Sequence, residues 1–171
     1  SEQVKTESFN VGDRIKVYVI DVKKATKGPQ IFLSRSHPGL VRRLFELEVP
    51  EISDGTVEIK GIAREAGSRT KIAVYSNDEN VDPVGACVGN RGTRVQNIVD
   101  ELFGEKIDII VWDEDPAVLI SNVLRPAEVE GVYINYVSEK EKMATAVVPE
   151  QQLSLAIGRE GQNVRLAARV S

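Results

Sequence analysis

Cysteine is nearly missing from this 171-residue chain, and long apolar runs are absent altogether. The one cysteine, Cys87, can form no internal disulfide, so nothing in the sequence implies an oxidising compartment. No apolar run approaches the roughly 18 residues that a membrane span needs. Residues 1–10 also lack the apolar stretch of a signal peptide. We therefore expect a cytoplasmic protein with no membrane contact.

The side chains on which most enzymes depend are also scarce. The only histidine, His37, lies between an expected strand and a proline, which favours a surface linker residue. Cys87 has no spare histidine to activate it, so a small core residue is the better interpretation. Asp113, Glu114 and Asp115 are consecutive and cannot converge on one ion as spaced ligands do, whereas acids suit a helix start. With no Walker-type loop either, we expect no catalytic residue, no cofactor and no metal.

The balance of charge argues against a simple electrostatic binder of nucleic acid, because the net charge is −4 and the isoelectric point is about 5.2. The charge is unevenly spread, however. Residues 1–36 have seven Lys/Arg against four Asp/Glu, residues 37–112 have nine against thirteen, and residues 113–171 have six against nine. Screening removes distant charges within about 10 Å, so the local sign matters more than the total.

Residues 11–36 are expected to form two strands. Ile15, Val17 and Val19 alternate with other residues at a period of two, and a second strand is expected at 30–34 after a basic, turn-rich stretch at 23–29. Two strands alone are marginal in water. We therefore expect them to be the end of a larger sheet, in a fragment whose beginning is missing.

A pattern of helices and strands begins at residue 37 and restarts at residue 113. Each copy has a helix ended by a proline, two strands, a glycine turn and a further helix, and the first copy closes with a strand in which Ile107, Ile109 and Val111 share a face. The expected helices and strands of the first copy are 40–48, 57–62, 70–76, 93–103 and 106–112. Those of the second copy are 117–124, 131–137, 142–148 and a helix after residue 161.

The spacing of equivalent residues shows that the two copies are repeats. Gly55 and Gly131 are 76 positions apart, and Gly89 and Gly158 are 69 apart. The smaller second offset fits shorter loops in the second copy, which has no counterpart to residues 77–80. Two copies indicate a tandem duplication rather than a solenoid.

A GxxG turn lies at the matching place in each copy, at residues 89–92 and 158–161. Such a turn between two helices presents backbone N–H groups and a helix N-terminus at one exposed spot. Glycine has no Cβ, so a sugar–phosphate chain can lie close to it. One GxxG is weak evidence, but two at matching positions of a repeat favour a clamp for single-stranded RNA.

The sequence resembles the NusA family of bacterial transcription elongation and antitermination factors from about Val11 to its end. The most specific segments are 33–38 (LSRSHP), 45–52 (FELEVPEI), 63–71 (AREAGSRTK), 82–89 (DPVGACVG), 104–108 (GEKID) and 153–168 (LSLAIGREGQNVRLAA). The resemblance implies an α+β protein in which the final strands of an S1-type (OB-fold) β-barrel precede two bacterial-type (type II) KH domains. The implied limits are 1–36, 37–112 and 113–171, with the last strand of the second KH domain missing.

The resemblance also implies that the chain binds single-stranded nascent RNA in a factor that modulates pausing, termination and antitermination by RNA polymerase. The implied RNA-binding residues are Lys71, Gly89, Asn90, Arg91, Gly92, Arg94, Gly158, Arg159, Glu160, Gly161, Asn163 and Arg165. Edge strands near 71–75 and 146–148 would complete the grooves, and Glu160 would act through its backbone. Polymerase would be contacted through a domain absent from this chain. The implied partners also include other antitermination factors, and the chain is expected to be a monomer.

Two alternatives remain open. Polynucleotide phosphorylase also carries S1 and KH domains, but there the KH domain comes first, in contrast to the order here. A KH-like protein-interaction module would be favoured if the GxxG loops were buried or pointed away from each other. Aromatic residues are only 5% of the chain, and we expect Tyr75, Tyr133 and Tyr136 to pack in the core.

Overall fold

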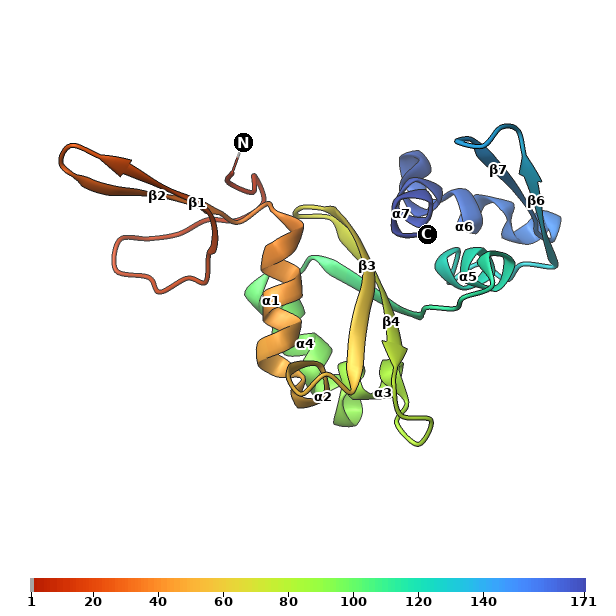
Figure 1. The fold of residues 1–171 in the computed structure, drawn as a ribbon, viewed down its shortest axis with the longest axis horizontal. Coiled ribbons are helices and arrows are strands. Elements are labelled where there is room, and N and C mark those ends of the chain that lie inside the picture. Colours follow the sequence, from red (N-terminus) through yellow and green to blue (C-terminus); the bar gives the residue numbers. More distant parts are fainter. Residues whose placement is uncertain (1) are drawn as a thin grey trace.

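The computed structural model describes residues 2–171 and arranges them in three successive parts (Figure 1). A two-stranded hairpin precedes a unit with a three-stranded sheet, and a unit with a two-stranded sheet follows. Among the helices of residues 2–171, none combines the length and the apolar character that a membrane span requires.

The hairpin pairs β1 (Tyr18–Ala25) with β2 (Gly28–Ser34) in antiparallel register. Its limits correct the sequence prediction, since residues 11–17 are not strand and all but residues 26–27 of the basic stretch 23–29, which we assigned to a turn, belong to the two strands. Ala25 pairs with Gly28, so the turn is only two residues long, and Gly28 meets its geometry with a φ of 112°. The apolar side chains of both strands are largely exposed, including Val22 and Ile31.

The first unit confirms the predicted order of elements. Its helices and strands are α1 (Pro38–Glu48), α2 (Pro50–Ser53), β3 (Val57–Glu65), β4 (Arg69–Ser76), α3 (Pro83–Val88), η1 (Asn90–Gly92), α4 (Thr93–Glu101) and β5 (Lys106–Val111). The strand order is β3-β4-β5, with β5 parallel to β4, so β4 is the central strand. Helices α1, α3 and α4 cover one face of this sheet over a core that includes Phe45, Ile72 and Cys87.

The second unit repeats this order as far as the helix after the glycine turn. Its elements are α5 (Pro116–Val123), β6 (Gly131–Tyr136), β7 (Lys142–Val147), η2 (Glu150–Gln152), α6 (Leu153–Ile157), η3 (Arg159–Gly161) and α7 (Gln162–Val170). The side chain of Asp115 accepts a hydrogen bond from the Ala117 N–H, which confirms this acid as the cap of α5.

The two units share a second core. Helix α7 lies against β3 and β4, on the sheet face opposite α1, and contributes Leu166 and Val170 to this core. Ile110 packs here, whereas Ile107 and Ile109 pack in the first core and Val111 is exposed. The prediction of one inward face for β5 was therefore incomplete, because the strand is covered on both sides.

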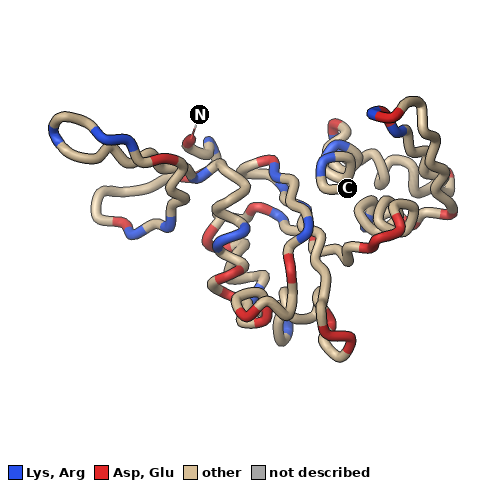
Figure 2. Tube along the Cα trace, in the orientation of Figure 1, with Lys and Arg blue, Asp and Glu red and all other residues tan. Residues whose placement is uncertain are grey.

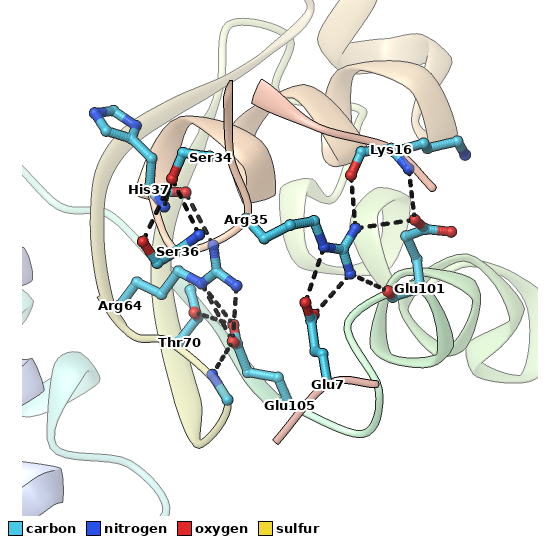
Figure 3. Close-up of polar contacts among 11 residues, drawn as sticks. Glu7, Lys16, Ser34, Arg35, Ser36, His37, Arg64, Thr70, Glu101 and Glu105 are labelled. Carbon is cyan, nitrogen blue, oxygen red and sulfur yellow. Dashed lines mark hydrogen bonds and ion pairs between the residues drawn. The ribbon is translucent and has the colours of Figure 1, made fainter. Parts of the chain in front are cut away.

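Arg35 fixes the hairpin to the first unit, and a second buried arginine, Arg64, is paired within that unit (Figure 3). Arg35 is buried and donates to both carboxylate oxygens of Glu7, to the Lys16 carbonyl, and to the carbonyl and side chain of Glu101. Arg64 forms an ion pair of 3.0 Å with Glu105, and both side chains are fully buried. The charge-assisted contacts of Arg35 leave little freedom at the joint between the hairpin and the first unit.

Candidate nucleic-acid interface

The two GxxG loops have nearly the same backbone. In the first loop (residues 89–92) the two glycines have φ values of 77° and 75°, and in the second loop (residues 158–161) they have 78° and 74°. Between them Arg91 and Glu160 have φ values of 54° and 56°, in the left-handed region that most side chains avoid. The repeat found in the sequence is therefore also a repeat of conformation.

The two glycines of each loop serve different purposes. A Cβ on Gly89 would lie 2.6 Å from Arg94 Cγ, and one on Gly158 would lie 2.7 Å from Asn163, so both positions are closed to larger residues. A Cβ on Gly92 would meet nothing within 4 Å. The last glycine therefore leaves open surface over the start of the following helix, where a phosphate chain can approach the backbone.

The side chains between the glycines are exposed. Asn90, Arg91, Arg159 and Glu160 all face solvent. Within residues 2–171, neither Arg91 nor Arg159 forms an ion pair, so both guanidinium groups are available to an anionic ligand. The loops are thus not buried, which was one of the two conditions that would have favoured a protein-interaction module.

The side chains of Arg94 and Asn163 hold the loops in place by hydrogen bonds to neighbouring backbone. Arg94 Nη1 donates to the Ala86 carbonyl at 2.7 Å and to Glu51 at 2.9 Å. At the equivalent position, Asn163 Nδ2 donates to the carbonyls of Ala156 and Leu124 at 2.9 and 3.0 Å. Asn163 is only 6% exposed, so its predicted role as an outward RNA contact is corrected to one of holding the turn.

Lys71 is a second correction. This residue is completely buried, and its ammonium group donates to the Arg125 carbonyl at 2.7 Å and lies 3.1 Å from Asp108. Burial lowers the pKa of the Lys71 amine, although Asp108 opposes that effect. The sequence prediction also took residues 71–75 for an edge strand, whereas β4 is the central strand of the sheet.

The second loop is tied to the first unit. Arg165 Nε donates to Glu65 in a short hydrogen bond, and its Nη1 donates to the Glu160 carbonyl at 3.0 Å. This guanidinium group holds the pKa of Glu65 below its usual range. Gln162, which the sequence prediction missed, donates to Glu65 at 2.8 Å and to Ser68 at 2.7 Å.

The loops lie at opposite ends of β3. The first loop is linked through Arg94 to Glu51 in α2, just before β3, and the second is linked to Glu65 at the end of that strand. Nine residues at roughly 3.3 Å each make the strand about 30 Å long. Acidic residues gather around α1, α2 and the loop before α3, whereas basic residues lie near the β3–β4 turn and on α7 (Figure 2).

The aromatic residues correct another expectation. Tyr133 and Tyr136 are 64% and 69% exposed, and Tyr75 is also exposed, so none of the three is a core residue. Tyr75 instead packs edge-on against Trp112 at 5.6 Å between ring centroids, and the Lys60 amine lies over both rings.

The residues that we considered for catalysis, His37 and Cys87, both contribute to the fold. His37 accepts a hydrogen bond from the Gly39 N–H and begins α1. Cys87 is buried, and this burial raises the pKa of its thiol to about 12. Across residues 2–171, no three His, Cys, Asp or Glu side chains are grouped as they would be to hold a metal ion.

Two units in which a GxxG turn joins helices beside a small sheet define a tandem KH protein. Family models agree, since "NusA-like first KH domain" matches residues 35–112 and "NusA-like second KH domain" matches residues 116–171. The chain belongs to the NusA family of KH proteins.

Curated relatives cover the whole of this chain. Those of Halalkalibacterium halodurans, Bacillus subtilis and Mycobacterium tuberculosis are 59%, 58% and 54% identical over 171 residues, and each is named transcription termination/antitermination protein NusA. The chain spans only 44%, 45% and 49% of their lengths. The crystal structure of APE1850 aligns with a TM-score of 0.54 at 21% identity, covering 74% of this chain and 83% of that one, which shows a shared fold.

Proposed function

We propose that this chain binds single-stranded RNA through its two GxxG loops. In the longer protein it would be the RNA-binding part of a transcription factor that modulates pausing, termination and antitermination by RNA polymerase. The observation that carries the proposal is that two exposed loops share one backbone conformation. The names of the relatives support the assignment to transcription.

Each loop would hold a phosphate stretch over its open last glycine. KH loops clamp about four nucleotides of backbone. Arg91 and Arg159 would pair with phosphates, and Glu160 would contribute only its backbone. The chain would need no cofactor and would catalyse no reaction, since it would act by holding the RNA as it leaves the polymerase.

The chain would act together with parts of the protein beyond this sequence. We assign residues 1–36 to the final strands of an S1-type barrel, residues 37–112 to the first KH domain and residues 113–171 to the second. The exposed apolar side chains of β1 and β2 support the first assignment, because they call for further strands. Polymerase and other antitermination factors would be bound through other domains of a monomeric cytoplasmic protein.

We further propose that a closing strand of the second KH domain pairs along β7. In the first unit, β5 follows α4 and pairs with β4, and β7 is the counterpart of β4. An apolar cavity of about 640 Å³ lies between the β6–β7 hairpin and helices α5, α6 and α7, with Ile134, Ala146 and Ile157 in its wall. A third strand would cover this cavity.

A protein-interaction module is the second candidate. Its support is the placement of the two loops at opposite ends of β3, together with the apolar cavity of the second unit. In this function the apolar surfaces of the KH domains would bind a protein segment, and the GxxG loops would contact no ligand.

Fluorescence anisotropy with a labelled single-stranded RNA at low and moderate salt separates the two candidates. The variant carries Asn90→Asp, Arg91→Asp, Arg159→Asp and Glu160→Asp, which makes both loops acidic without touching their glycines. We expect the chain to bind RNA more weakly as salt rises and the folded variant to lose binding. Absent binding, or binding indifferent to the loops, would favour the protein-interaction module.

A further inference from the structure

A cavity of about 320 Å³ lies between the second loop and the first unit. Ser68, Arg69 and Lys106 line it from the first unit, at the β3–β4 turn and the start of β5. From the second unit its wall includes Arg159 and the apolar side chains of Pro126 and Leu155. This volume is at the lower end of the range for small-ligand sites, about 300–1,000 Å³, and suits one small unit of a ligand.

The charge of the cavity is positive. Lys106 and Arg159 are exposed, and among residues 2–171 neither has an ion-pair partner. Arg69 is paired with Asp108 at 2.8 Å. No carboxylate lines the cavity, and the nearby Glu65 already accepts hydrogen bonds from Gln162 and Arg165. Two free cations therefore face a small space with no acid to neutralise them.

The wall of the cavity also contains an unsatisfied acceptor. The Asn163 amide nitrogen donates to two carbonyls, whereas its Oδ1 is buried and has no hydrogen-bond partner among residues 2–171. Such orphaned atoms are rare in folded proteins and mark places where a water or ligand completes the structure. The groups that a ligand can reach are the two cations and the apolar side chains of Pro126 and Leu155, and they suit a ligand with an anionic group beside an apolar part.

The first loop is fastened within its own unit. Its Arg94 pairs with Glu51, and both residues belong to the first unit. The second loop differs because its binding to the first unit places Lys106 of one repeat beside Arg159 of the other.

We propose that this junction cavity binds one nucleotide of a single-stranded RNA held by the second loop. The phosphate lies between Lys106 and Arg159, and the sugar and base lie against Leu155 and Pro126. The first unit thus supplies a binding residue to the loop of the second, and Lys106 is a determinant of RNA affinity in its own right. The inference rests on the proposed function.

The test uses anisotropy with a fluorescein-labelled random pool of single-stranded RNA of about 12 nucleotides, enough for two loops at four nucleotides each and the crossing between them. The variant is Lys106→Gln, and its matched control is Lys140→Gln, which removes the same charge from the exposed β6–β7 turn. We expect Lys106→Gln to lower the RNA affinity about tenfold and to reduce the slope of log affinity against log salt concentration by about one. The control variant should change neither the affinity nor the slope.

Arg159→Gln and the double variant complete the design. If both cations hold one phosphate, the double variant loses less affinity relative to the parent chain than the product of the two single losses. Thermal melting must show that each variant remains folded. Suppose that the parent chain binds RNA and that the acidic-loop variant does not. Equal RNA affinities of Lys106→Gln and Lys140→Gln would then overturn the cavity assignment but not the proposed function. A chain that binds no RNA overturns the proposed function together with it.

Discussion

The two GxxG loops differ in their surroundings far more than in their own geometry. Their φ values agree within a few degrees, including those of the strained residues Arg91 and Glu160. The first loop is fastened within its own unit, whereas the second is fastened to its neighbour through Glu65 and Ser68. Duplication has therefore preserved a backbone while the chemistry around it has diverged.

This difference extends to the two units as a whole. Every ion pair in residues 2–171 involves at least one residue before position 112, and none is formed within the second unit. The first unit has its own apolar core, whereas the second shares its core with β3, β4 and β5. The second unit thus depends on the first for both its packing and its charge pairs.

The largest expected effect is on the first unit. Glu105→Gln leaves the buried Arg64 guanidinium without a counter-charge, so we expect the free energy of unfolding to fall by about 3–5 kcal/mol. Glu128→Gln, an exposed acid of the second unit, is the control and should change it by less than about 0.5 kcal/mol. Urea unfolding followed by circular dichroism measures both. Equal stabilities would show that the buried pair does not hold the first unit together.

The shared core comes next. Leu166 is 0% exposed on α7, and Leu166→Ala should cost about 2–5 kcal/mol by opening a cavity between the units. Val164→Ala, on the exposed side of the same helix, is the matched control. Trp112 is the only tryptophan and packs against this core, so its fluorescence reports the loss directly. An unchanged fluorescence transition would contradict the dependence of the second unit on the first.

Exchange of the middle residues tests the loops themselves. Because Arg91 and Glu160 have the same φ, Arg91→Glu and Glu160→Arg change the charge at almost constant backbone strain. We expect RNA affinity to fall about tenfold in the first variant and to rise several-fold in the second. Anisotropy titrations at three salt concentrations measure both effects. Two variants that bind as the parent chain does would mean that the loop side chains do not face phosphate.

Cys87 offers the mildest effect and reports on the first unit alone. Its pKa is about 12 in the folded chain and about 8.5 when unfolded. A raised pKa stabilises the fold at pH values below the unfolded pKa, and this contribution is lost as the pH rises from about 8.5 towards 12. We expect iodoacetamide to leave the folded chain unmodified at pH 8 and to label it rapidly in urea. Rapid labelling without urea would show that the first unit opens readily.

Local pattern was sufficient to predict the order of the main helices and strands and the repeat, although not the limits of the first hairpin. Glycines 89, 92, 158 and 161 could be placed because a left-handed backbone leaves a direct signature in the sequence. What could not be predicted depends on which elements become neighbours. Nothing local shows that β5 pairs beside β4, which buries Lys71 and makes β4 central.

The same limit hid the junction between the units. Gln162, Ser68 and Lys106 are unremarkable in the sequence and meet only because α7 lies on the first sheet. Asn163 was assigned to RNA contact because a polar residue beside a glycine turn can either contact a ligand or hydrogen-bond to the backbone inside the fold. Only the packing of α5 and α6 around it decides between the two roles.

The hydrogen-bond network around Arg35 connects the β1–β2 hairpin to the helix that follows the first loop. Arg35 grips the C-terminal end of α4 at Glu101, and the first GxxG loop lies at the other end of that helix. Nine residues of helix make a stiff rod of about 14 Å between them. The β1–β2 hairpin and the first loop are therefore connected through the two ends of one helix, whereas the second loop is connected to the first sheet through Glu65 and Ser68.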